Sequence, residues 1–216
     1  MGYRSSMLVV DEYGIGAVTL TAGSMSALPL LYGAVVNTFV AAVDEAAWEH
    51  AEKNYARTFV STSHGGNSSK ISATFTLDED SLLISSLERD GSDILAGMVD
   101  IFNLTMGQYS APVTAPFRLF PSVDMDKPVT LPGCDNSTVI AEKWSVWPTL
   151  DGSGSDSDLP GAGFGNDDGC LTWTIGDWVH YGGEPLDRLL FYKNEDGEVV
   201  GFEAPFLRSG VLRPEE

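Results

Sequence analysis

Hydrophobic and polar residues alternate along several segments of the chain. In KISATFTL, the side chains of Ile71, Ala73, Phe75 and Leu77 fall on one face and those of the polar residues between them on the other. Because successive side chains of a strand point to opposite faces of a sheet, this alternation predicts a strand with one buried face. Two short strands are expected in MLVVDEYGIGAVTLTAG, and further strands in VTAPFRLF, TVIAEKWSVW, LTWTI with DWVHY, RLLFYK and VVGFEA.

Apolar spacings of three and four residues predict helices in two regions. From Leu28 to Val43 apolar side chains recur on one helical face, and Asp44 is expected to cap a second helix or to lie in a continuation of the first. This apolar run is shorter than the ~20 residues that a membrane helix needs, so it is interpreted as core. The segment SDILAGMVDIFNL predicts another helix, with Ser92 as its N-cap.

The order of these elements predicts an α+β fold, with N-terminal helices packed on a mostly antiparallel β-sheet and a β-rich C-terminal half. A single domain is expected over residues 1–216, with a sub-boundary near residue 111, where the helical pattern stops and Pro and Gly dominate the connections. Asp196-Gly197 predicts a hairpin turn between RLLFYK and VVGFEA, because Gly accepts positive φ without steric cost.

The net charge narrows the classes of function. The chain has 12 Lys and Arg against 31 Asp and Glu, which gives a formal charge of −19. Such a surface repels phosphates, so nucleic-acid binding is excluded. The excess acid is interpreted as solvation in a saline medium, with clusters of carboxylates that bind divalent cations as the alternative.

Cysteines and glycosylation sequons favour an oxidising compartment. Cys134 and Cys170 match neither a zinc cluster nor a C-x-x-C pair and are expected to form one disulfide, with free buried thiols as the alternative. Asn67, Asn103 and Asn136 each begin an N-glycosylation sequon, which requires a secretory route. An extracellular or virion-associated location is expected, with the cytoplasm as the alternative.

Several catalytic motifs are absent from the sequence. His64-Gly65-Gly66 is similar to an esterase oxyanion loop, but no G-x-S-x-G nucleophile elbow accompanies it, so these glycines are interpreted as a hairpin turn. The histidines His50, His64 and His180 are too far apart in sequence to form a helical zinc motif.

Calcium is the cofactor with the best case, since no other is expected. The segment from residue 151 to 169 combines many glycines with carboxylates, the oxygen ligands that Ca²⁺ prefers. It does not match an EF-hand, and the alternative is a solvated loop. The metal ligands predicted here are Asp151, Asp156, Asp158, Asp167 and Asp168.

Tryptophans gather around the second cysteine and predict a binding surface. If LTWTIGDWVHY is one strand, Trp178 and His180 share a polar face with Thr174, a pairing suited to stacking on a sugar ring. Trp147 is included in this ligand-binding set, and the alternative is that these tryptophans are core. The opposite, core-facing side of that strand would carry Leu171, Trp173, Ile175, Asp177, Val179 and Tyr181.

These observations predict an acidic, soluble binding or assembly protein that has protein partners or self-assembles, without membrane insertion. A carbohydrate- or calcium-binding module is one alternative, with a glycan or cation as the ligand. The other is a small acid–base enzyme that uses His180 with Asp177 or Glu203, if the last strands bring these side chains together with Glu184.

Overall fold

The computed structural model describes residues 2–10, 14–24, 26–61, 69–78, 81–106, 112–122, 127–131, 138–150, 177 and 179–215. The chain forms two compact units, Met1–Lys53 and Asn54–Glu216.

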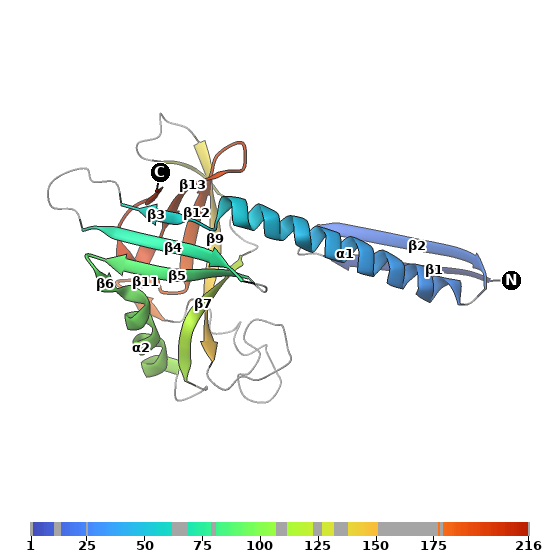
Figure 1. The fold of residues 1–216 in the computed structure, drawn as a ribbon, viewed down its shortest axis with the longest axis horizontal. Coiled ribbons are helices and arrows are strands. Elements are labelled where there is room, and N and C mark those ends of the chain that lie inside the picture. The colour runs from blue at the N-terminus through green and yellow to red at the C-terminus, as the bar shows by residue number, and fades with distance from the viewer. Residues whose placement is uncertain are drawn as a thin grey trace. The chain divides into compact units, whose positions relative to one another are not determined.

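The first unit is a β-hairpin followed by a long helix. Strands β1 (Gly2–Val10) and β2 (Ile15–Gly23) pair antiparallel, which confirms the two predicted strands. Helix α1 spans Ala27–Asn54, and the hairpin runs beside its first half (Figure 1). Exposure alternates along β2, so one face of the hairpin is half-buried and the other is exposed.

Helix α1 decides between the two alternatives for Asp44. The helix continues through this residue, so Asp44 lies inside it and does not cap a second helix. The interpretation of Leu28–Val43 as core is wrong, because the apolar window of α1 has no buried residue, and Leu30 and Phe39 are 74% and 59% exposed. Within the described residues α1 is the one helix that is long and apolar enough, by length and composition, to cross a membrane.

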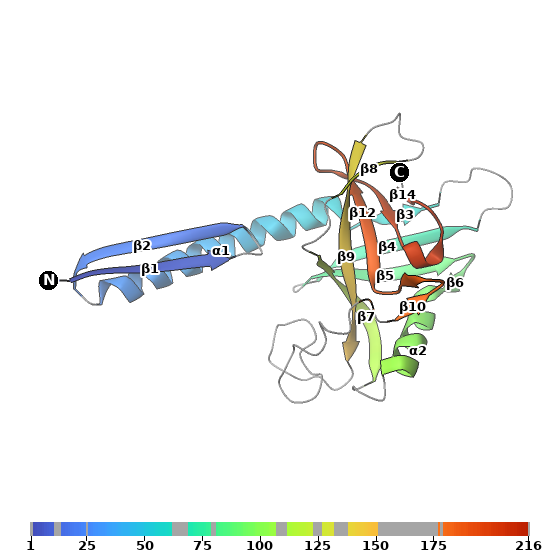
Figure 2. The ribbon, with the colours of Figure 1, turned by 180° about the vertical axis from the view of Figure 1, so that it is seen from behind.

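The second unit is an antiparallel sheet that curls into a nearly closed barrel (Figures 1 and 2). Along the sheet its main strands are β13 (Val199–Glu203), β12 (Arg188–Lys193), β9 (Thr138–Leu150), β7 (Val113–Pro121), β5 (Leu82–Arg89), β4 (Ile71–Leu77), β3 (Thr58–Val60) and β14 (Arg213–Pro214). The two ends of this order meet, because Phe202 of β13 forms a bridge with Leu212, just before β14.

Among the described residues, this unit also contains four shorter strands and a short helix. They are β6 (Ser92–Asp93) beside β5, β8 (Lys127–Thr130) beside β9, the pair β10 (His180–Tyr181) and β11 (Glu184–Pro185), and the 3-10 helix η2 (Pro205–Leu207). The described chain is therefore a β-rich α+β protein with an antiparallel sheet, as its sequence pattern predicts in outline.

Aromatic rings fill the inside of the barrel. Phe59, Phe75, Phe191 and Phe202 are almost completely buried, and their ring centroids lie 4.9–5.9 Å apart in tilted and edge-on pairs. Such geometry is favourable for aromatic pairs beyond the area that they bury. The described strands of the barrel thus share one aromatic core.

Helix α2 (Ile94–Met106) packs on the outside of the barrel, against β5 and β7 (Figure 2). Leu95, Met98 and Phe102 are buried there, as the helical spacing predicts. The predicted N-cap is one residue off, because Oδ1 of Asp93, not Ser92, accepts hydrogen bonds from the backbone N–H groups of Leu95 and Ala96.

The predicted turn at Asp196-Gly197 is confirmed. Strands β12 and β13 pair antiparallel, and the backbone N–H of Asn194 donates to the carbonyl of Glu198 at 3.0 Å. Gly197 has a φ of 79°, the left-handed conformation for which glycine is preferred.

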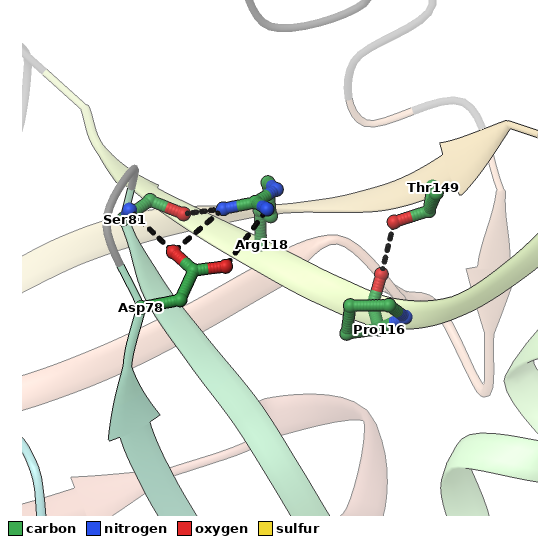
Figure 3. Close-up of polar contacts among 5 residues, drawn as sticks. All are labelled: Asp78, Ser81, Pro116, Arg118 and Thr149. Atoms are coloured by element: carbon green, nitrogen blue, oxygen red, sulfur yellow. Dashed lines mark hydrogen bonds and ion pairs between the residues drawn. The ribbon is translucent and has the colours of Figure 1, made fainter. Parts of the chain in front are cut away.

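Polar side chains at the end of β4 and at the start of β5 form hydrogen bonds with a side chain of β7 (Figure 3). The guanidinium of Arg118 donates to both carboxylate oxygens of Asp78, at 2.9 and 2.8 Å, and to Ser81 Oγ at 2.9 Å. On the next strand the hydroxyl of Thr149 donates to the carbonyl of Pro116 at 2.8 Å. A bidentate pair of this kind fixes the relative position of two strands.

Candidate functional site

Many of the predicted site residues lie outside the described residues. These are Asn67, Cys134, Asn136, Asp151, Asp156, Asp158, Asp167, Asp168, Thr174 and Trp178 with Cys170. The calcium loop, the disulfide and two sequons therefore stay predictions. In the part of the chain that the structure describes, no three His, Cys, Asp or Glu side chains are grouped so that they could hold a metal ion.

In the remaining sequon, the side-chain amide of Asn103 is already held in hydrogen bonds, which disfavours its glycosylation. Asn103 Nδ2 donates to the carbonyl of Val113 at 2.9 Å, and its Oδ1 accepts from the backbone N–H of Val113 at 2.7 Å. The amide nitrogen that a glycan would modify is thus engaged in joining α2 to β7. Glycosylation at Asn103 would break this pair of hydrogen bonds.

The segment LTWTIGDWVHY was predicted as a single strand, and the structure contradicts this prediction at Asp177. Asp177 has a φ of 59°, which a continuous strand cannot contain, and Tyr181 is 60% exposed although it was predicted to face the core with Val179. Among the described residues, His180 and Tyr181 pair with the two residues of β11, across a turn at Gly182 and Gly183.

Asp177 lies in a cluster of opposite charges at the start of β12. Its Oδ1 is 3.2 Å from Nη2 of Arg188, and its Oδ2 is 3.8 Å from Nζ of Lys143. Nη1 of Arg188 is 3.8 Å from Oε2 of Glu184. Arg188 is therefore close to both Asp177 and Glu184, which are two of the four residues predicted for acid–base chemistry.

Glu203 belongs to a different contact. Its Oε2 accepts a hydrogen bond from the hydroxyl of Tyr192 at 2.5 Å. Burial of Tyr192, and then the adjacent carboxylate, raise the pKa of its phenol far above the ordinary value of 10. His180 is exposed in β10, opposite Pro185. The proposed grouping of His180 with Asp177 or Glu203 stays a prediction.

The most unusual ionisable group of this region is Asp187, which sequence reasoning missed. Its carboxylate is buried, Oδ2 accepts from the backbone N–H of Asp177 at 2.8 Å, and Oδ1 has no hydrogen-bond partner among the described residues. Burial, and next the charge of Asp177, raise the pKa of Asp187 above 3.8. The signal that could have found it is an acid inside the apolar run PLDRLL.

A second polar group links the segment after α1 to the barrel wall. Glu142 of β9 accepts hydrogen bonds from the hydroxyl of Tyr55 at 2.5 Å and from Trp144 Nε1 at 2.9 Å, and Lys193 Nζ donates to its other oxygen at 2.7 Å. Trp144 is buried against Tyr55 and Phe191, so it is part of the core. All members of this group are satisfied by each other, which indicates a structural role.

Trp147 also lies in β9, half-buried and opposite Arg118 of β7. Of the predicted ligand-binding set, only this residue and His180 are described. The structure places them on different strands, β9 and β10.

Comparisons with known proteins identify relatives of the whole chain. Residues 47–215 match the family described as "Beta-lactamase-like-like, C-terminal domain". The chain is similar to a "Beta-lactamase-like protein" of Arthroderma benhamiae, with 29% identity over 98% of this chain and 36% of that protein. It is also similar to a "Probable hydrolase M10" of a Phoma species, with 28% identity over 92% of this chain and 31% of that protein.

The chain thus spans about a third of the length of the curated relatives it matches. No solved structure matches it.

Proposed function

The chain belongs to the family described as "Beta-lactamase-like-like, C-terminal domain", and on this premise we propose that it works as the C-terminal part of a longer hydrolase. The observation that carries the proposal is the family match over residues 47–215, which covers the whole barrel. It is supported by the relatives, which carry hydrolase-type names and are about three times as long as the matched region.

This family membership corrects the function predicted from composition. The predicted acidic binding or assembly protein with a structural role is contradicted by the match to a β-lactamase-like family and by the names of the two relatives. The same findings contradict the predictions of a carbohydrate-binding protein and of a glycoprotein. The prediction failed because net charge describes solvation and long-range repulsion, which hydrolases and binding proteins share.

The chemistry of the chain indicates where the reacting groups of such a hydrolase lie. The sequence contains neither S-x-x-K, the nucleophile motif of serine β-lactamases, nor a G-x-S-x-G elbow. Its three histidines are separated by more than a helical turn, so they form no local zinc motif. We therefore place the nucleophile or metal in the part of the polypeptide that precedes this chain.

The barrel would then serve as a rigid support for the hydrolase domain. Packed phenylalanine rings occupy its interior, and α2 closes part of its outer surface through Leu95, Met98 and Phe102. This contact also supports the finer prediction that N-terminal helices pack on the antiparallel sheet, for α2. Rigid scaffolds that position residues of other segments are common in enzymes.

The proposal is tested by comparing the 216-residue chain with the product of the complete open reading frame of its gene, which the proposal expects to be a longer protein. Both proteins are assayed with a chromogenic β-lactam and with a series of p-nitrophenyl esters. The longer protein is expected to hydrolyse at least one of these substrates, whereas the 216-residue chain alone hydrolyses none, because its nucleophile is missing.

A variant separates support from catalysis in the same assay. Phe191→Leu keeps the barrel core apolar and is expected to leave the kcat of the longer protein largely unchanged while lowering its thermal stability. Turnover by the 216-residue chain alone, or a longer protein that cleaves none of the substrates, would contradict the proposed function.

A further inference from the structure

The outer face of the hairpin is an uncharged, apolar surface on a very acidic chain. The side chains of Tyr3, Met7, Val9, Val18 and Leu20 are 92%, 72%, 62%, 65% and 74% exposed. They are cross-strand neighbours, because Met7 pairs with Val18 and the other positions follow in register. The remaining residues of this face are Ser5, Gly16 and Ala22, so no charged side chain belongs to it. We refer to these eight residues as the outer face.

The other face of the same hairpin is apolar near the loop, where Leu8, Val10, Ile15 and Ala17 are half-buried, and polar towards the open end, where it carries Arg4, Ser6, Thr19 and Thr21. The half-buried residues of α1, such as Val36 and Val40, recur at helical spacing. The half of the hairpin near the loop therefore has apolar side chains on both faces, which is typical of sheets that are covered on both sides. The described part of the chain provides a helix for one side only.

The comparisons indicate what covers the outer face. The family model begins at residue 47, so the hairpin and most of α1 precede the C-terminal domain. The relative from Arthroderma benhamiae matches 98% of this chain, including the hairpin, yet this match accounts for 36% of its length. Because the family is described as a C-terminal domain, we take the remaining sequence of that relative to precede its match, next to the hairpin.

We propose that the outer face docks onto the hydrolase portion that precedes this chain in the longer polypeptide, so that β1, β2 and α1 complete that portion and do not belong to the barrel. This inference rests on the proposed function, because the hydrolase portion that would cover the outer face comes from that proposal. Apolar patches of this kind on one side of a sheet mark interfaces. The open edges of β1 and β2, which have no further partner strand among the described residues, fit the same occupant.

The test is hydroxyl-radical footprinting of the 216-residue chain and of the longer protein from the same gene, read by mass spectrometry. Met7 is the probe on the outer face, Met98 is the buried reference, and Tyr181 is the exposed reference on the barrel. In the 216-residue chain Met7 is expected to be labelled readily. In the longer protein its labelling is expected to fall to the level of Met98, while that of Tyr181 stays the same.

Two further labelling conditions test whether a second copy of this chain or a lipid surface covers the outer face instead. The 216-residue chain is labelled over a range of protein concentrations and with phosphatidylcholine vesicles. Protection of Met7 that rises with concentration would replace the proposal with a second copy of this chain, and protection by vesicles would replace it with a lipid surface. Equal labelling of Met7 in both proteins would overturn it directly.

A variant keeps the proposal testable if labelling is hard to quantify. Val18→Asp is expected to leave the thermal melt of the 216-residue chain unchanged, because the site is exposed there, and to lower that of the longer protein. The matched control is Tyr181→Asp, on the exposed barrel surface, which should affect neither. Hydrolysis by the same longer protein is recorded separately, so protected Met7 without hydrolysis contradicts only the proposed function, and hydrolysis with exposed Met7 contradicts only the docking.

Discussion

The hairpin unit and the barrel are both rich in apolar strands, but only the barrel buries them. In the barrel, Phe59, Phe191 and Phe202 are completely buried by strands from the same unit. In the hairpin unit, Met7 and Leu20 are also apolar strand residues, but their side chains stay about three-quarters exposed. This difference shows the limit of the pattern. Alternation of apolar and polar residues along a strand predicts which side chains share a face, but not whether another layer covers that face.

Core truncation gives the largest expected difference between the two units. Phe191→Ala removes a ring that contacts Tyr55, Phe75 and Phe202, so it should lower the free energy of unfolding of the barrel by about 3 to 5 kcal/mol. Leu20→Ala removes an exposed side chain from the outer face and should change stability by less than about 0.5 kcal/mol.

Urea unfolding followed by circular dichroism and tryptophan fluorescence measures both effects in the 216-residue chain. If Leu20→Ala destabilised this chain as strongly as Phe191→Ala, the outer face would already be covered within it. The contrast between the two units would then be wrong.

Glycine-to-alanine replacements compare how closely the backbone is packed in the barrel and in α1. A Cβ at Gly201 of β13 would lie 2.6 Å from Cγ1 of Val211, so Gly201→Ala should cost about 1 to 3 kcal/mol. A Cβ at Gly33 of α1 meets no atom within 4 Å, so Gly33→Ala should stabilise the helix by about 0.5 to 1 kcal/mol. Thermal melts of the two variants should therefore shift in opposite directions, and a shift in the same direction would contradict this packing.

The smallest effect concerns the buried carboxylate of Asp187, which lies between β11 and β12. Because the pKa of Asp187 is raised in the folded state, its contribution to stability is complete below pH 3.8 and is lost as the pH rises through the folded-state pKa. Asp187→Asn should therefore gain stability relative to the wild type between pH 4 and pH 8, by about 1 kcal/mol. Unfolding midpoints across this pH range measure it.

Asp196→Asn is the matched control for Asp187, because Asp196 lies in an exposed turn. Its unfolding midpoints are recorded at the same pH values and give the baseline for an Asp-to-Asn change at an exposed position. An Asp187→Asn profile parallel to that of the wild type would show that the buried carboxyl does not titrate in this range.

Local chemistry explains which elements could be predicted from the sequence. The β12–β13 hairpin, β4 and α2 were predicted because a turn at Asp196-Gly197, a period of two and a helical stripe are each encoded within a few residues. Strand β5 was missed because its burial pattern breaks at Ser85 and Ser86, where the register with β4 shifts. A bulge inserts one residue and reverses the alternation that a period-two search needs.

The candidate site was less predictable than the fold. The partners of Asp177, namely Lys143 and Arg188, come from separate strands, and the burial of Asp187 depends on the turn that β11 and β12 form. Neither relation has a local sequence signal, since both arise from tertiary packing. The family was missed for a different reason, because neither S-x-x-K nor G-x-S-x-G occurs in this sequence.

The closing contact of the barrel has a consequence for how the chain is made. Strand β3 pairs with β14, and these two strands lie at opposite ends of the barrel sequence. At synthesis rates of about 5 to 20 residues per second, roughly 10 to 30 s separate their appearance on the ribosome. Throughout that interval the outer edge of β3 lacks its neighbour, and Phe59 lacks the ring of Phe202. The nascent barrel therefore passes through a prolonged open stage, in which chaperone binding or mispairing competes with the final strand.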